Sequence, residues 1–184
     1  MTTHRLTREQ LSSLSLWGGA TTAMALWGMH QVSGPLVPFV VVLAATITAL
    51  ALYDLEQRRL PDWLTLTLVI GGLLCHWRTG TASGPFITGA MLAAVLLLAV
   101  RSLFLLTSKV DALGLGDVKL AGAAGIWLGW SNVPLFLMLA TFGGVGWYVM
   151  IRAINRDAAC RTDIPFGIPL CFALWLVWLR DMAV

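Results

Sequence analysis

Long apolar runs separated by short polar stretches occupy most of the chain. A helix needs about 20 apolar residues to cross the hydrocarbon core of a membrane, and lipid-exposed backbone must satisfy its own hydrogen bonds. The pattern therefore predicts an all-α, polytopic integral membrane protein with about seven transmembrane helices. The apolar segments cover residues 12–30, 36–53, 63–77, 85–106, 118–130, 133–151 and 166–180.

The composition excludes an ordinary water-soluble domain. Of the 184 residues, 58% are hydrophobic and 11% are charged, whereas soluble domains carry about 25% charged residues. A soluble protein of this size could not bury so much apolar surface. No low-complexity linker or soluble domain interrupts the apolar runs, so we expect a single membrane-embedded domain over residues 1–184.

The basic residues are scattered between the apolar runs, so the formal net charge of +3 indicates membrane topology and not a nucleic-acid partner. With the N-terminus in the cytoplasm, only Arg78 and Arg180 fall outside, and Arg101 lies in the inner half of the fourth segment. This imbalance predicts an internal N-terminus and an external C-terminus. The basic residues expected on the cytoplasmic side are Arg5, Arg8, Arg58, Arg59, Lys109, Lys119, Arg152, Arg156 and Arg161.

Leu11–Met29 has no clear small-x-small cleavage site, and we therefore expect no cleaved signal peptide. Glycines recur in the fifth and sixth apolar segments, at spacings that let helices approach closely in membranes. We interpret them as packing residues. They are Gly122, Gly125, Gly129, Gly143, Gly144 and Gly146.

Asp54 follows the second apolar segment, at the C-terminal end of the predicted helix. A carboxylate at this end faces the negative pole of the helix dipole, which is unfavourable for stability. A structural explanation is an ion pair with Arg58, four residues further along. The functional explanation is a carboxylate held at the membrane edge for chemistry.

Asp117 opens the fifth segment and follows the glycine-rich run Gly114-Leu115-Gly116. A structural explanation is strong, because aspartate is a preferred N-cap and the glycines would form the turn before the helix. The glycines also allow a second explanation. Without side chains, they would let the backbone of a substrate approach closely.

The functional explanation is stronger for the two aspartates together, because the predicted topology places both at the cytoplasmic edge of the membrane. Ionisable groups near the hydrocarbon are costly and suggest function. Two facing carboxylates in a low-dielectric site cannot both ionise easily, which provides one acid and one base. The ionised aspartate could take a proton from water while the protonated one polarises a scissile carbonyl. The pair thus predicts aspartyl proteolysis, without assigning either role to one residue.

Three motifs in this order resemble the type IV prepilin peptidases, which belong to the GxGD class of membrane aspartyl proteases. The first is Asp54 with the run Arg58–Thr65 (RRLPDWLT), and the second is Gly114–Leu120 (GLGDVKL). The third is Pro165–Pro169 (PFGIP), near the C-terminus. The resemblance spans essentially the whole chain.

The resemblance implies an endopeptidase of the bacterial inner (plasma) membrane with its active site facing the cytoplasm. Its partners would be membrane lipid and a pilin or pseudopilin precursor, from which it would remove the short basic leader. Asp54 and Asp117 would be catalytic. We interpret Asp62, beside Pro61, as an N-cap. The residues expected to shape the site are Gly114, Gly116, Lys119 and Asp62.

The cysteines separate the chain from longer members of that family, which carry two CxxC pairs and also methylate the new N-terminus. Cys75, Cys160 and Cys171 form no CxxC pair, and Cys75 and Cys171 lie in apolar runs as small buried side chains or free thiols. The chain therefore resembles the short form, which implies no N-methyltransferase activity. We predict no metal, no S-adenosylmethionine and no other cofactor.

Two other classes of function stay open at this stage. An ion or solute transporter could use membrane-edge aspartates, although transporters often show internal repeats and charges near the bilayer midplane. The sequence shows no such repeat, and a flux assay on both aspartate variants would discriminate. A non-catalytic membrane scaffold of a secretion or pilus machine would require both aspartates to be dispensable.

Overall fold

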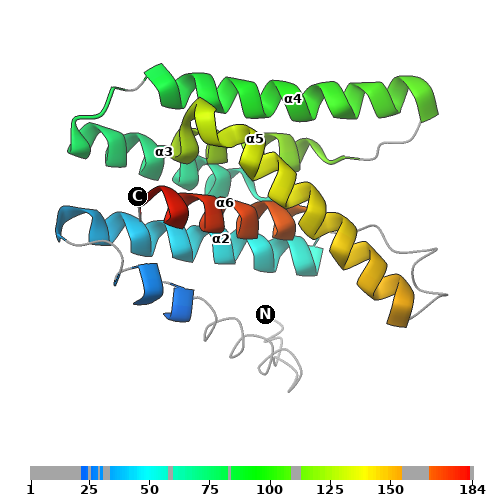
Figure 1. Ribbon diagram of the computed structural model, residues 1–184, viewed down its shortest axis with the longest axis horizontal. Helices are drawn as coiled ribbons and strands as arrows, with labels where there is room; N and C mark the ends of the chain where they lie inside the picture. The colour runs from blue at the N-terminus through cyan, green and yellow to red at the C-terminus, as the bar shows by residue number, and fades with distance from the viewer. Residues whose placement is uncertain are drawn as a thin grey trace, which may run out of the picture.

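The computed structural model describes residues 22–24, 26–28, 30, 34–57, 60–82, 84–108, 113–154 and 166–182. These residues are helical apart from short connections, which confirms the predicted all-α class. The helices form an elongated bundle (Figure 1). Most of the first apolar segment, 12–30, lies outside the described residues. The elements are η1 (Gly34–Leu36), α2 (Val37–Gln57), α3 (Asp62–Thr79), α4 (Gly84–Ser108), α5 (Leu115–Ile154) and α6 (Gly167–Met182).

Three helical stretches are long and apolar enough to cross a membrane, namely Val37–Gln57, Gly84–Thr107 and Leu115–Met150. The outer surface of α4 indicates its surroundings most directly, because Met91 is 62% exposed and Leu103 is 60% exposed. Apolar side chains exposed over a whole helix face are typical of contact with lipid. The helices are therefore those of a membrane protein.

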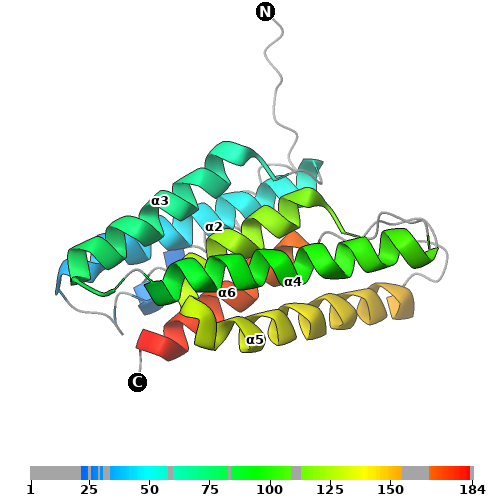
Figure 2. The ribbon, with the colours of Figure 1, turned by 90° about the horizontal axis from the view of Figure 1, so that it is seen from above.

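Helix α5 reverses its direction at Gly129. This residue has φ 70° and ψ 166°, which is non-helical and lies in the left-handed region that favours glycine. Figures 1 and 2 both show the chain of α5 running along the bundle and then back again. The two arms of α5 correspond to the separate segments 118–130 and 133–151 that the sequence predicts.

The first arm of α5 packs against α4 with almost no space between the two backbones. A Cβ added to Gly125 would lie 2.4 Å from the carbonyl oxygen of Gly89, and one added to Gly89 would lie 2.6 Å from the carbonyl carbon of Gly129. At Gly122 the nearest atom would be Ala94 Cβ at 3.5 Å, an ordinary contact. The prediction that glycines serve close helix packing is confirmed at Gly125.

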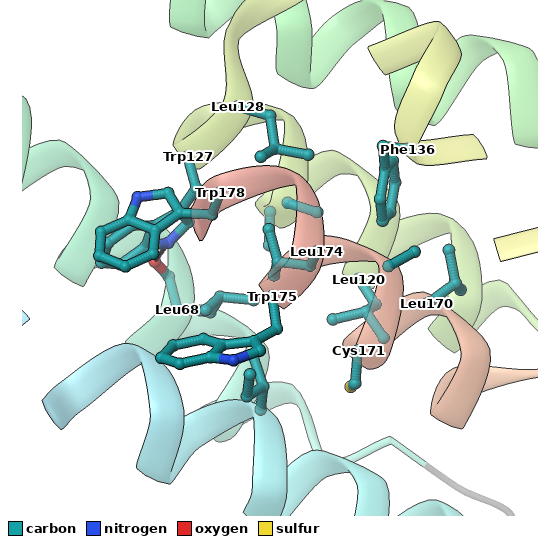
Figure 3. Packing of buried hydrophobic residues seen from close by; sticks show 14 of the residues in the cluster. Leu68, Leu120, Trp127, Leu128, Phe136, Leu170, Cys171, Leu174, Trp175 and Trp178 are labelled. Carbon is teal, nitrogen blue, oxygen red and sulfur yellow. Dashed lines mark hydrogen bonds between the residues drawn. The ribbon is translucent and has the colours of Figure 1, made fainter. Parts of the chain in front are cut away.

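Helix α6 lies in the core, where it packs against both α2 and α5. Three tryptophans join it to its neighbours (Figure 3). Trp178 stacks on Trp175 with ring centroids 5.8 Å apart and meets the edge of Trp127 at 6.1 Å. The indole N–H of Trp127 donates a 2.8 Å hydrogen bond to the carbonyl oxygen of Leu68 in α3. This packing fixes where the N-terminal end of α6 lies.

Candidate active site

Asp54 is buried because it continues the core-facing stripe of α2. Leu43, Ile47 and Leu50 occupy the preceding positions of that stripe, at helical spacings of three and four residues. Asp54 takes the next position, in the last turn, and only 6% of it is exposed. Arg58, the partner in the structural explanation, lies outside the described residues.

Asp117 is the third residue of α5 and is only 9% exposed. Its N–H donates a 3.2 Å hydrogen bond to the carbonyl oxygen of Gly114, so Gly114 and not Asp117 is the cap of the helix. The N-cap explanation for Asp117 is therefore wrong. Its carboxylate is hydrogen-bonded to the backbone of Gly114, as an acid at the third helical position can be. The glycine turn thus positions the acid.

The N-terminal end of α6 contacts the Asp54 carboxylate directly. A Cβ added to Gly167 would lie 2.6 Å from Asp54 Oδ2 and 2.9 Å from Asp54 Cγ, so a larger residue there would displace the carboxylate or the start of α6. The neighbouring Phe166 and Pro169 pack on glycines in the second arm of α5, where added Cβ atoms would meet them at 3.2 Å at Gly144 and 3.4 Å at Gly143. These contacts hold the start of α6 against the acid.

The two carboxylates are close enough to interact electrostatically. The buried thiol of Cys171, one turn after Gly167, is within electrostatic reach of both. The C-terminal end of α2 and the N-terminal ends of α5 and α6 meet at one end of the bundle in Figures 1 and 2. Two buried carboxylates in this relation can share one proton and act as an acid and a base.

Asp62, Lys119 and Gly116, which the sequence predicts to shape the site, make contacts between the first and second motifs. Asp62 Oδ1 and Lys119 Nζ form a 2.7 Å salt bridge, with 77% and 54% of their side chains exposed. The N-cap interpretation of Asp62 is wrong, because Pro61 precedes the helix and makes no side-chain cap, and Asp62 is the first residue of α3. A Cβ added to Gly116 would lie 3.2 Å from Leu60 Cβ, whereas Gly114 is exposed.

The sequence did not predict a role for Arg101 near the site. Its guanidinium donates a hydrogen bond to the carbonyl oxygen of Leu113, directly before the glycine turn. From the sequence alone, this arginine indicated only membrane topology. The available signal was a single charge inside the apolar run of α4, since such a charge needs a partner.

Comparisons with known proteins identify relatives of the chain. Residues 41–149, more than half of the chain, match the type IV leader peptidase family. A prepilin leader peptidase/N-methyltransferase of Aeromonas hydrophila is 36% identical over 143 residues, which cover 75% of this chain and 48% of that protein. Proteins of the same name are 30% identical over 89% of this chain in Burkholderia pseudomallei (strain 1026b) and 33% identical over 66% in Escherichia coli (strain K12).

The chain spans about half the length of these relatives, since the matched regions cover 48%, 47% and 53% of them. No solved structure matches the chain significantly.

Proposed function

Because the chain belongs to the type IV leader peptidase family, we propose that it removes the leader peptide from prepilin or prepilin-like precursors, with Asp54 and Asp117 as an aspartyl dyad. One observation carries the proposal. Three motifs that are far apart in the sequence meet around these two buried carboxylates, and Gly167 of the third motif lies against the first acid. An arrangement this specific is unnecessary for stability, because like charges oppose each other.

The reaction uses one proton shared by the pair. The ionised carboxylate takes a proton from water, and the water oxygen attacks the carbonyl carbon of the scissile peptide bond. The protonated carboxyl group donates to the carbonyl oxygen and stabilises the tetrahedral intermediate. When the intermediate collapses, a carboxyl proton passes to the leaving nitrogen and the C–N bond breaks. Acid and base belong to the pair and not to individual residues.

The proposed topology has seven spans, with the N-terminus in the cytoplasm and the C-terminus outside. On this count α2 ends, and α5 and α6 begin, on the cytoplasmic side, which agrees with the meeting of these three ends at one end of the bundle. The reversal at Gly129 supports the count. If α5 were a single span, α6 would begin on the opposite side from Asp54. The dyad then lies at the cytoplasmic edge of the bacterial inner membrane.

The partner in this proposal is a pilin or pseudopilin precursor, whose hydrophobic N-terminal helix shares the membrane with the enzyme. The relatives carry the combined name peptidase/N-methyltransferase. For this chain we propose peptidase activity without methyl transfer, because its sequence contains no CxxC pair. The mass of the new N-terminus of the product tests this part separately.

Co-expression of the full chain with a candidate precursor tests the peptidase proposal. Mass spectrometry should find the mature product with wild type and only uncut precursor with Asp54→Asn or Asp117→Asn, while both variants remain in the membrane. Asp181→Asn is the matched control, because Asp181 is exposed in the last turn of α6 and bonds to Asn132. Normal processing by either dyad variant would disprove the proposal.

A further inference from the structure

Arg101 is the one charged residue within α4 (Gly84–Ser108). A charged side chain in an apolar span is costly unless a partner satisfies it. Here the guanidinium crosses to the next segment of the chain and donates a hydrogen bond to the carbonyl oxygen of Leu113, a residue 12 positions further along. The bond therefore joins the cytoplasm-proximal part of α4 to the entrance of α5.

The carbonyl group of Leu113 needs a partner from outside α5. The hydrogen bonds of that helix begin with the carbonyl oxygen of Gly114, which accepts the N–H of Asp117. Leu113 comes one residue earlier, so its carbonyl group lies outside the helical ladder. A polar backbone group near the membrane must be satisfied elsewhere. Arg101 supplies the partner, and it does so four residues before Asp117.

Two other contacts hold the same turn from a different element. Gly116 contacts Leu60, which lies in the connection between α2 and α3. Lys119 forms its salt bridge with Asp62, the first residue of α3. Arg101 reaches from α4. The start of α5 is thus attached to two separate parts of the bundle. Without Arg101, the turn would lose this hydrogen bond to α4.

We propose that Arg101 is a positioning residue, which holds the Leu113–Asp117 turn so that Asp117 faces Asp54. The proposal rests on the peptidase function proposed above. A misplacement of about 1 Å can lower the rate of a chemical step by roughly a hundredfold. Such an effect reduces kcat and leaves the KM for the precursor unchanged.

Three variants of the full chain, reconstituted in lipid, separate this role from a general one. Arg101→Met removes the donor, and Arg101→Lys keeps a cationic donor without the planar guanidinium. Ser102→Ala is the control, because that hydroxyl bonds to Leu98 within α4 itself. We expect Arg101→Met to lower kcat by roughly 10- to 100-fold with KM unchanged. Arg101→Lys should recover a large part of the loss, and Ser102→Ala should match wild type.

Hydrogen–deuterium exchange supplies a readout that does not depend on activity. Arg101→Met should speed exchange of the amides in residues 113–120 and leave those around Gly125 unchanged. If wild type fails to cleave any precursor, the peptidase proposal is wrong, and exchange still decides whether Arg101 holds the turn. Wild-type kcat in Arg101→Met, a change in KM alone, no recovery with Arg101→Lys, or faster exchange throughout α4 and α5 would each overturn the positioning role.

Discussion

The two ends of the bundle hold their polar groups in opposite ways. At the carboxylate end, formed by Asp54, Asp117 and Gly167, two buried acids of like charge lie within electrostatic range. At the histidine end, His76 Nε2 bonds to the carbonyl oxygen of Ile126 at 2.7 Å and Nδ1 bonds to Thr81 Oγ1 at 3.1 Å. The end with complementary partners contributes to stability. Repulsion between two buried acids of like charge is unfavourable for folding, and we therefore expect function at the carboxylate end.

The histidine end also shows what a structural polar residue requires. Ile126 lies three residues before the reversal at Gly129, where carbonyl groups at the end of a helical arm need partners from outside the helix. His76 provides one, and its ring stacks on Phe86 with centroids 3.4 Å apart. Every feature of this residue is explained by packing and hydrogen bonding. Asp54, by contrast, is buried within electrostatic range of a second acid, Asp117.

Replacing one of the two acids should give the largest loss of activity while the stability of the protein is retained. Asp54→Asn or Asp117→Asn should lower the cleavage rate by at least about a thousandfold, because each would remove one member of the proposed dyad, which would act as a unit. Thermal unfolding in the same detergent should show stability equal to or above that of wild type, since a like-charge opposition is gone. A large loss of stability in both variants would make the carboxylates structural.

Gly167→Ala tests the space around the first acid. The added Cβ would lie 2.6 Å from Asp54 Oδ2, so the carboxylate or the start of α6 must shift. We expect a fall in kcat of roughly 10- to 100-fold. Gly146→Ala is the matched control, because nothing lies within 4 Å of an added Cβ there. Equal rates for the two variants would remove the third motif from the site.

Gly125→Ala tests the close backbone packing between α4 and the first arm of α5. An added Cβ would meet backbone atoms of Gly89 at 2.4 and 2.5 Å, and backbone cannot move aside as a side chain can. The free energy of unfolding should fall by about 1–3 kcal/mol. Gly122→Ala, whose nearest contact would be 3.5 Å, should change it little. The comparison is measured by denaturant or thermal unfolding in one detergent.

His76→Phe should have the smallest effect of these variants. Unlike the variants of Asp54 and Asp117, it should lower stability and leave cleavage unchanged. The aromatic stacking can persist, while the hydrogen bonds to Ile126 and Thr81 are lost. Stability should fall by about 1–2 kcal/mol, with the cleavage rate of the folded protein unchanged. Thr67→Ala, whose hydroxyl bonds within α3, is the control. Loss of cleavage without loss of stability would contradict the division between the two ends.

Local sequence patterns predicted most of the helices and indicated Asp54 and Asp117 as candidate site residues. Apolar run lengths placed the helical segments, and the break between 118–130 and 133–151 anticipated the reversal that Gly129 makes. Asp54 and Asp117 were identified by their residue type at helix ends and by the motifs around them. Such signals are visible in sequence because each lies within one or two helical turns.

Contacts between distant residues were not predictable from those patterns. The contact of Gly167 with Asp54, the bond of Arg101 to Leu113 and the pairing of Lys119 with Asp62 depend on how whole helices pack. The two N-cap interpretations failed for a related reason. A cap is defined by where the chain becomes helical, and each aspartate lies one to three positions inside the helix.

Cross-linking of the two acid positions tests most directly whether their side chains meet. Asp54→Cys and Asp117→Cys would be combined in a chain whose native Cys75, Cys160 and Cys171 are replaced, and treated with a short bifunctional thiol reagent. The control pairs Asp117→Cys with Asp181→Cys, near the other end of α6 and about 20 Å from Gly167 at 1.5 Å per residue. We predict an intramolecular cross-link, located by mass spectrometry, in the 54/117 pair and none in the control. Failure of the 54/117 pair to cross-link, with its two thiols labelled from opposite sides of the membrane, would contradict the account.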